Sequence, residues 1–521
     1  MIIEEQCSLD DATEMKRSKN FEAEIRPKIA AGLDEKLCSS YEGYRPTEPR
    51  TEIDVVKVPE TEDEINQFFE TYVVERKPCK IVGIPEDISF LRKLKPSNIQ
   101  QVLPPEEILT IEKKNEGGFG SGATRLKMSF GQFLDKLLNE GKDDLYLTTQ
   151  YFEDDPNNGD YSTDEEEKDQ VLEEDFDTGS ITFDNLHDDF DDLQEEEPCE
   201  TGSDDSDSLE EQELRIKELY QPPMTNLVDN LPEAPKFLNY LIPQQINLWI
   251  GAAKPQHDEA EDDAWLSNFD PSDSNGRLGL GRNIPGGGSS SGLHHDHADN
   301  LYVPIAGHKR FTLFAPCDAA KMYTVGTIRH LFASGVIDYV ADSHAPLWRQ
   351  LRDDGAMTAE VYRTLLNSGT LDPETKKHYE DFLSIDLQQQ LKAAHHKQDK
   401  LDPPSFSIIP PCVVHLEDIK NTKIKNSIAK CSENRWPQFF KAHRITVDLK
   451  PGEMLYLPTG WFHEVTSYGD NDKNDKNVHV AANYWFIPPT GHDINHAYLD
   501  SYWPNDYAIT QRALKTIRKH L

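Results

Sequence analysis

The chain has 521 residues, which leaves room for two or three domains or for one large domain with insertions. Hydrophobic residues account for only 36% of it and the formal net charge is −40, so we expect part of the chain to remain outside any packed core. This charge also argues against direct binding to nucleic acid or to an anionic membrane, because the surface lacks the cations that neutralise phosphates.

The cysteines give no sign of a structural framework. All seven are scattered along the chain and none forms a CxxC pair, which argues against a zinc cluster or a disulfide scaffold and favours a reducing compartment. The first residues, MIIEEQCSLDD, are acidic and lack the apolar stretch of a signal peptide. No apolar run reaches the length of about 18 residues that a membrane helix needs. We therefore expect a cytoplasmic or nuclear protein.

Residues 51–152 are predicted to form the N-terminal part of a folded unit, after an N-terminal extension over residues 1–50. Thr61 followed by Glu64 is a capping box that opens a helix, and Ser129 is typical of the cap of a second helix. Apolar patterns predict strands over 53–58, 78–82 and 145–150.

A glycine-rich stretch, Gly117-Gly-Phe-Gly-Ser-Gly122, lies between these segments. A phosphate-binding loop would need a strong strand before it and a helix opening directly on it. Neither is predicted here. The tip of a flexible hairpin is therefore the better interpretation.

Residues 153–213 are strongly acidic. They hold 28 Asp and Glu residues against one lysine, which accounts for 27 of the 40 net negative charges. Like charges at this density cannot bury enough apolar surface to fold. We interpret the stretch as a disordered insertion. A decoy for a basic partner is the functional alternative, and ordered structure is expected to return near Leu219.

Residues 214–490 are predicted to form the core of the unit, with insertions at 254–290 and 318–440, and residues 491–521 a helical C-terminal segment. Leu301–Ile305 and Lys309–Pro316, separated by Ala306-Gly307, resemble a β-hairpin. Further strands are expected over 245–251, 444–449, 454–457, 463–466 and 479–486, and helices over 359–366, 378–395 and 508–521. This succession is typical of a mainly β fold with flanking helices, a cupin-like double-stranded β-helix or jelly roll.

The stretch Ser291-Gly-Leu-His-His-Asp-His-Ala-Asp-Asn-Leu-Tyr302 concentrates metal-binding side chains. In an extended strand His294 and Asp296 leave the same face. With a distant histidine such as His463 they would form the facial triad of non-haem Fe(II) oxygenases, which leaves coordination positions open. His297 and Asp299 make a second HxD pair, and spacing alone does not choose between the two.

Two further residues support the hypothesis but are weak signals on their own. Lys309 lies on the strand after the motif, where its ammonium could pair with a dicarboxylate. A single strand lysine is more often exposed to solvent. His463 sits in Trp461-Phe-His-Glu464, and a buried packing histidine would give the same pattern.

The segments SGLHHDHADNLY, IAGHKRFTLFAP, PGEMLYLPTGWFHEV and HVAANYWF together resemble the JmjC-domain 2-oxoglutarate oxygenases. The similarity is strongest to the small JmjC-only lysyl hydroxylase that acts on developmentally regulated GTP-binding proteins. It includes Asn247-Leu-Trp-Ile-Gly251 and extends over roughly residues 51–150 and 220–500.

The resemblance implies a role for individual residues. His294, Asp296 and His463 would bind Fe(II), because the leucine before the first ligand and the Asn-Leu-Tyr after the second match only that pair. Lys309 would hold the distal carboxylate of the cosubstrate 2-oxoglutarate. The other cosubstrate contacts implied are Tyr146, Ser291, Asn300 and Asn483. His295, His297 and Asp299 would then surround the site, and Thr148 stands where the small JmjC-only hydroxylases carry glutamine.

The function implied is hydroxylation of a protein substrate, a lysyl side chain of a GTPase in the first place, with O₂ as the oxidant. A JmjC lysine demethylase is the alternative within the same chemistry. A non-catalytic JmjC scaffold that binds a basic partner through its acidic loop is the alternative outside it. The C-terminal helix could support a homodimer.

Overall fold

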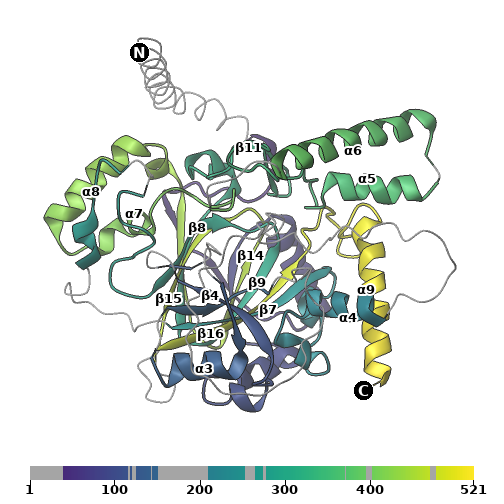
Figure 1. Cartoon of the computed structure of the whole chain (residues 1–521), viewed down its shortest axis with the longest axis horizontal. Coiled ribbons are helices and arrows are strands. Elements are labelled where there is room, and N and C mark those ends of the chain that lie inside the picture. The colour runs from purple at the N-terminus through teal and green to yellow at the C-terminus, as the bar shows by residue number, and fades with distance from the viewer. Residues whose placement is uncertain are drawn as a thin grey trace, which may run out of the picture.

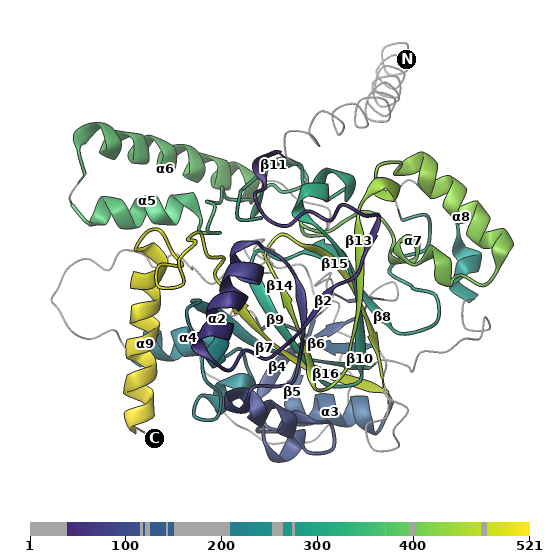
Figure 2. The same ribbon diagram turned by 180° about the vertical axis from the view of Figure 1, so that it is seen from behind.

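Two β-sheets form the centre of the molecule, and helices lie around them (Figures 1 and 2). The computed structural model describes residues 39–114, 118–119, 125–141, 144–150, 209–252, 264–273, 277–369, 371–394, 402–469 and 477–520. Most of the N-terminal extension and the acidic stretch up to residue 208 lie outside these ranges.

The two sheets are built from strands far apart in the sequence. The first sheet contains, in spatial order, Arg50–Thr51 (β1), Arg444–Leu449 (β13), His308–Phe314 (β10), Phe462–Tyr468 (β15) and Ser289–His295 (β8). The second contains Asp54–Lys57 (β2), Cys79–Val82 (β3), Glu453–Leu457 (β14), Asp299–Ala306 (β9), Val478–Phe486 (β16), Pro243–Ala252 (β7), Leu145–Leu147 (β6), Ile108–Lys113 (β4) and Arg125–Ser129 (β5).

The sheets face each other, since Lys309 on β10 reaches Tyr146 on β6 with 3.4 Å between Nζ and the phenolic oxygen. Every residue of β9, β15 and β16 is buried. Strands covered on both faces carry continuous apolar runs rather than alternation, which is why these segments stand out in the sequence. The arrangement is the expected double-stranded β-helix.

The hairpin predicted for Leu301–Ile305 and Lys309–Pro316 is wrong. β9 pairs with β14 and β16 in the second sheet, whereas β10 pairs with β13 and β15 in the first. Only Gly307 separates the two strands, and the common hairpin loops contain at least two residues. The chain therefore turns at Gly307, whose φ is 71°, and crosses from one sheet to the other.

Both predicted helix caps are confirmed. Thr61 caps Glu62–Phe68 (α2) and Ser129 caps Phe130–Leu138 (α3), and each forms a full capping box with the residue three positions on. β4 and β5 pair as an antiparallel hairpin across the glycine-rich stretch. Of that stretch, the structure describes only Gly118 and Phe119.

Order returns earlier than predicted after the acidic stretch. Leu209–Leu219 (α4) begins ten residues before the expected point and buries Ile216 and Leu219. Its acidic first turn is compatible with the positive end of the helix dipole. The closing helix, Tyr502–His520 (α9), likewise starts before residue 508 and contacts α4, with an ion pair between Arg215 and Asp506. Dimerisation through α9 stays a prediction.

The helices of the second insertion form two separate groups. Thr358–Asn367 (α5) and Pro373–Ala394 (α6) form a helix pair on one side of the sheets, which agrees with the predicted helices. Pro411–Val414 (α7) and Thr422–Arg435 (α8) lie on the other side, near β8 (Figures 1 and 2). Ile328–Leu331 (β11) pairs with Ile337–Tyr339 (β12) as a small separate sheet. None of the described helices has the length and apolar character that a membrane span requires.

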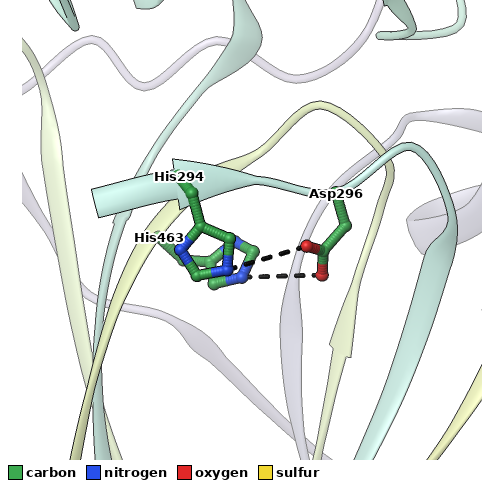
Figure 3. A group of neighbouring side chains, drawn as sticks. All are labelled: His294, Asp296 and His463. Carbon is green, nitrogen blue, oxygen red and sulfur yellow. Dashed lines mark ion pairs between the residues drawn. The ribbon is translucent and has the colours of Figure 1, made fainter. Parts of the chain in front are cut away.

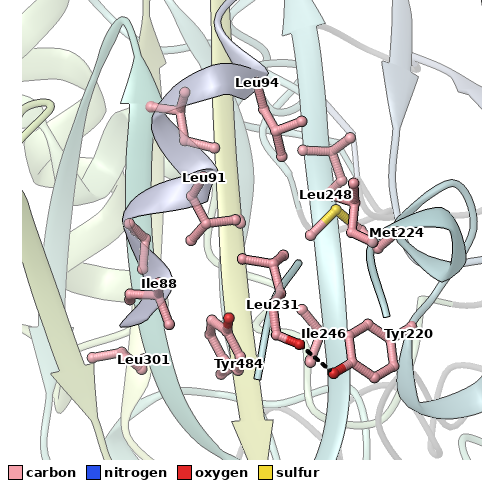
Figure 4. Packing of buried hydrophobic residues seen from close by; sticks show 14 of the residues in the cluster. Ile88, Leu91, Leu94, Tyr220, Met224, Leu231, Ile246, Leu248, Leu301 and Tyr484 are labelled. Atoms are coloured by element: carbon pink, nitrogen blue, oxygen red, sulfur yellow. Dashed lines mark hydrogen bonds between the residues drawn. The ribbon is translucent and has the colours of Figure 1, made fainter. Parts of the chain in front are cut away.

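The core that supports the second sheet is built mainly from apolar side chains. A short 3₁₀ helix, Glu86–Leu94, buries Ile88, Leu91 and Leu94 against β7, β9 and β16 (Figure 4). Tyr220 packs in the same cluster and satisfies its hydroxyl by donating to Leu231 O at 2.8 Å. Burial of this kind contributes about 1.5–3 kcal/mol for each large apolar side chain, so the sheet is a rigid base for the side chains on its other face.

Candidate metal centre

His294, Asp296 and His463 come together where β8 ends (Figure 3). His294 on β8 and His463 on β15 are direct cross-strand partners, and Asp296 follows just beyond the end of β8. The Nε2 atoms of His294 and His463 lie 3.7 Å and 3.6 Å from the two carboxylate oxygens of Asp296. Among the described residues, this is the group of His, Cys, Asp or Glu side chains close enough to hold a metal ion.

Both imidazoles are oriented by backbone carbonyls. Nδ1 of His294 lies 3.0 Å from Gly292 O, and Nδ1 of His463 lies 2.9 Å from Trp461 O. A carbonyl only accepts, so each Nδ1 carries the proton and each Nε2 offers its lone pair toward Asp296. Burial, and then the neighbouring His463, lower the pKa of His294 well below its usual value. Two neutral imidazoles and one carboxylate are a donor set that fits Fe(II).

The second HxD pair is used differently. Asp299 is fully buried, forms an ion pair with Arg76 and accepts hydrogen bonds from the Tyr456 hydroxyl and the Thr459 N–H at 2.6 Å and 2.9 Å. His297 Nε2 lies 3.0 Å from Ile337 O. Neither side chain belongs to the group around Asp296.

Asp299 nevertheless supports the site. Thr459, held by Asp299, belongs to the turn before β15, and Gly460 N in the same turn donates to Asp296 O at 2.9 Å. The Arg76 carbonyl accepts from Trp461 Nε1 at 3.0 Å. The ion pair between Arg76 and Asp299 therefore fixes the turn that leads to His463.

Lys309 is buried rather than exposed to solvent. It is 3% accessible, and its Nζ lies 2.6 Å from Ser467 Oγ and 3.4 Å from the Tyr146 hydroxyl. Burial lowers the pKa of Lys309 to about 7, against the opposing attraction of the Glu464 carboxylate. An ammonium held in this way favours an anionic ligand.

The other residues expected around the cosubstrate lie in two places. Asn300 and Asn483 are hydrogen bonded to each other at 3.3 Å, and Asn483 also accepts from Trp249 Nε1 at 2.9 Å. The Ser291 hydroxyl donates to Gly292 O and accepts from Val465 N–H, so backbone groups occupy it. Ser467, rather than Ser291, contacts Lys309. Thr148 Oγ1 donates to the neighbouring backbone at 3.4 Å.

Three further buried residues, which the sequence did not identify as site residues, lie near Lys309 and the expected cosubstrate residues. Asn247, Tyr302 and His479 each carry buried polar side-chain atoms for which the described residues provide no hydrogen-bond partner. The ring of Tyr302 lies 5.7 Å from Lys309 Nζ, and Asn247 is the cross-strand partner of Asn483. Buried polar groups of this kind are costly without a partner. Together with Lys309 they fit a small dicarboxylate such as 2-oxoglutarate.

The cross-strand register explains how His479 comes to lie beside Tyr146. Gly251 on β7 stands between Tyr146 on β6 and His479 on β16, and is the direct partner of both. A methyl group built on Gly251 would lie 2.3 Å from the Tyr146 ring and 3.0 Å from His479 Nε2. Glycine at this position lets the two rings approach to 5.2 Å. Only the pairing of β6, β7 and β16 reveals this relation.

The fold and the metal centre agree with the comparisons with known proteins. The chain belongs to the cupin-like domain family, whose model matches residues 65–492. JmjC domain-containing protein 4 of Schizosaccharomyces pombe is 26% identical over 74% of this chain and 74% of its own length.

Two other relatives match a shorter part. JmjC domain-containing protein E of Dictyostelium discoideum is 26% identical over 40% of this chain and 42% of its own length. A lysine-specific demethylase of Arabidopsis thaliana is 24% identical over 41% of this chain and 42% of its own length. The family match and these relatives support membership of the JmjC oxygenase superfamily.

Proposed function

We propose that the protein is an Fe(II)- and 2-oxoglutarate-dependent protein hydroxylase, with a lysyl side chain of a GTPase or a related protein as the substrate. The meeting of His294, Asp296 and His463 at one point carries the proposal. Bound Fe(II) with 2-oxoglutarate supplies the oxidising chemistry that inserts one oxygen atom of O₂ into a C–H bond. The substrate part is supported by the resemblance of the motifs to the JmjC-only lysyl hydroxylase.

The side chains of this chain divide the work between them. His294 and His463 would offer fixed neutral nitrogens to Fe(II), and Asp296 would add one negative charge. Three protein donors would leave coordination positions for the cosubstrate and O₂. Lys309, steadied by Ser467 and Tyr146, would pair with the distal carboxylate of 2-oxoglutarate. The buried walls around these groups exclude water and keep the electrostatic interactions strong.

The metal assignment predicts a visible absorption band when Fe(II) and 2-oxoglutarate are added to the purified protein without oxygen. His463→Ala should abolish the band, because it removes one of the three metal donors. His297→Gln is the matched control, since His297 Nε2 lies 3.0 Å from Ile337 O and the side chain is not part of the group around Asp296; this variant should keep the band. A band that survives His463→Ala would show the metal assignment to be wrong.

A lysine demethylase is the second candidate, favoured by the Arabidopsis relative named as a lysine-specific demethylase. The two reactions share the same oxidant and differ in the carbon that is hydroxylated: a methylene carbon of the lysyl side chain in the hydroxylase, and an N-methyl carbon in the demethylase. Hydroxylation of an N-methyl carbon gives a hemiaminal that releases formaldehyde.

Mass spectrometry of the protein substrate separates these candidates. A candidate GTPase and a methylated lysine peptide would be incubated with the protein, Fe(II) and 2-oxoglutarate, and succinate release measured in parallel. A gain of one oxygen supports the hydroxylase, and loss of a methyl group supports the demethylase. If no assay gives the absorption band or succinate, the better interpretation is a non-catalytic scaffold that binds its partner through the acidic stretch.

A further inference from the structure

Two segments outside the central sheets meet at the strand that carries His294. Residues 277–283 belong to the first predicted insertion and residues 402–408 to the second. The Ser407 N–H donates to Leu293 O at 2.8 Å. The Phe406 ring stacks on the His294 imidazole, with centroids 4.7 Å apart and planes at 10°. The second insertion therefore covers one face of a candidate metal ligand.

Arg282 of the first insertion connects these segments. It is 2% accessible, and its Nη2 donates to Asp402 Oδ1 at 2.9 Å. The carbon at the centre of its guanidinium lies 5.0 Å from the centre of the Phe406 ring. Arg277 forms a second ion pair with Asp402. Asp402 and Phe406 are thus held from the first insertion by charge and by cation–π contact.

The other side of Arg282 reaches the cosubstrate residues. Its Nη1 donates to Phe119 O and, at 3.3 Å, to Ser291 O. The Phe119 ring stacks on Tyr146 with centroids 3.7 Å apart and planes at 10°, and lies 5.8 Å from Lys309 Nζ. Phe119 therefore covers the residues expected to hold the cosubstrate, and Arg282 fixes its backbone.

We propose that Arg282 is a positioning residue that couples the two halves of the site. It holds Phe406 against the metal ligand His294 and Phe119 over Tyr146 and Lys309. The inference rests on the proposed function, since Fe(II) and 2-oxoglutarate are the groups that these halves would hold. Both insertions act through this one guanidinium, which assigns them a role in assembling the site.

Arginine suits this position because its planar fork offers five N–H donors in fixed directions, whereas a lysine is a point charge on a flexible stem. The backbone at Gly118 lies very close to Arg282. A methyl group on Gly118 would lie 2.5 Å from Arg282 Cβ and 2.6 Å from Ser290 O. The segment before Phe119 can therefore lie against Arg282 only with glycine at this position.

The test uses the full-length protein, with Co(II) as the metal probe and N-oxalylglycine as an analogue of 2-oxoglutarate. Arg282→Lys keeps the charge that faces Asp402 but loses the fork. It should weaken Co(II) binding and analogue binding by about tenfold each, as loss of a group that orients a metal ligand does, and shift the Co(II) absorption bands. Phe406→Leu should weaken Co(II) binding alone. If Arg282→Lys does not fold, Asp402→Asn, which removes the ionic partner of Arg282, replaces it with the same expectation.

Arg349→Lys is the matched control. Arg349 is also a largely buried arginine with two carboxylate partners, but those partners are Glu360 on α5 and Asp386 on α6, away from the metal centre. It should lower the melting temperature and leave both affinities unchanged. Unchanged affinities in Arg282→Lys, or loss of only one of them, would overturn the coupling role. Failure of the unmodified protein to bind Co(II) and the analogue would instead overturn the proposed function.

Discussion

Asp296 and Asp299 lie three residues apart and have opposite surroundings. Asp296 faces two neutral imidazole nitrogens, whereas Asp299 is paired with the Arg76 guanidinium. A carboxylate between neutral nitrogens is poised for a cation, and one that already holds a guanidinium is a structural ion pair. The same residue type in the same short motif therefore serves two purposes, and the surroundings alone assign them.

This difference predicts opposite effects of two equal substitutions. Asp299→Asn should lower the free energy of unfolding by about 3–5 kcal/mol, because it leaves the Arg76 charge buried without its ionic partner. Folded Asp299→Asn should still bind Co(II). Asp296→Asn should abolish Co(II) binding with little loss of stability. Denaturant unfolding and calorimetric Co(II) titration at low temperature measure both, and the reverse pattern would select His297 and Asp299 as the ligand pair.

How far the sequence alone reaches is clearest for single residues. The HxD spacing permits two ligand pairs, and only the family resemblance selects His294 and Asp296. Lys309 looks like an ordinary exposed strand lysine until the second sheet covers it. Ser467 and His479 carry no local signal, because their approach to Lys309 and Tyr146 depends on which strands pair. Contacts between side chains that strand register brings together cannot be predicted without the order of the strands in the sheets.

At the scale of elements, local interactions were predictable and pairings were not. The caps at Thr61 and Ser129 depend on groups three residues away, so the sequence contains everything they need. The hairpin at Gly307 was wrong because strand pairing is not local. Two apolar strands joined by a short link can lie in one sheet or in two. Here the link is the single residue Gly307, which is too short for a common hairpin loop, so the strands lie in different sheets.

Gly307 therefore has a testable role at the crossing between the sheets. A methyl group there would lie 2.5 Å from Tyr468 O and 3.0 Å from His479 Cβ. Gly452, at the Pro451-Gly452 turn, also has positive φ, but a methyl group would meet nothing within 4 Å. We expect Gly452→Ala to lose roughly 1 kcal/mol from backbone strain, and Gly307→Ala about 2–3 kcal/mol more from the clash with a backbone carbonyl.

Chemical denaturation of the two glycine variants provides the measurement. Because both glycines have left-handed backbone, the difference between the two losses isolates the steric contribution. Equal losses would mean that the corner at Gly307 relaxes without cost, and that the close approach of β10, β15 and β16 does not constrain it.

At the scale of the whole molecule, the jelly roll must be stable enough to hold an unfavourable buried charge. The apolar cluster behind the second sheet and the strands covered on both faces provide that stability. Burial of Lys309 costs part of this stability, because its ammonium lies between the sheets with hydroxyl groups as its close partners. Sites that hold a group ready for a ligand commonly lower the stability of the free protein.

Lys309→Met should therefore stabilise the ligand-free protein. The folded-state pKa of Lys309, about 7, lies below its ordinary value of 10.5, so the unfolded chain binds one more proton between these pH values and stability rises with pH through this group. The gain from Lys309→Met should be largest at pH 7 and below, roughly 1–2 kcal/mol, and vanish toward pH 10.5. Denaturant titrations at several pH values measure this trend.

Lys80→Met is the control, because the Lys80 ammonium pairs with Glu453 at 2.8 Å and its replacement should bring no gain. Adding 2-oxoglutarate to the same variants separates the effect on stability from the effect on cosubstrate binding. With metal present, 2-oxoglutarate should raise the melting temperature of the unmodified protein by mass action and leave that of Lys309→Met unchanged. A variant that is more stable but still responds to 2-oxoglutarate would show that the cosubstrate carboxylate binds elsewhere. A variant that is less stable at pH 7 would show that Lys309 contributes to the fold itself.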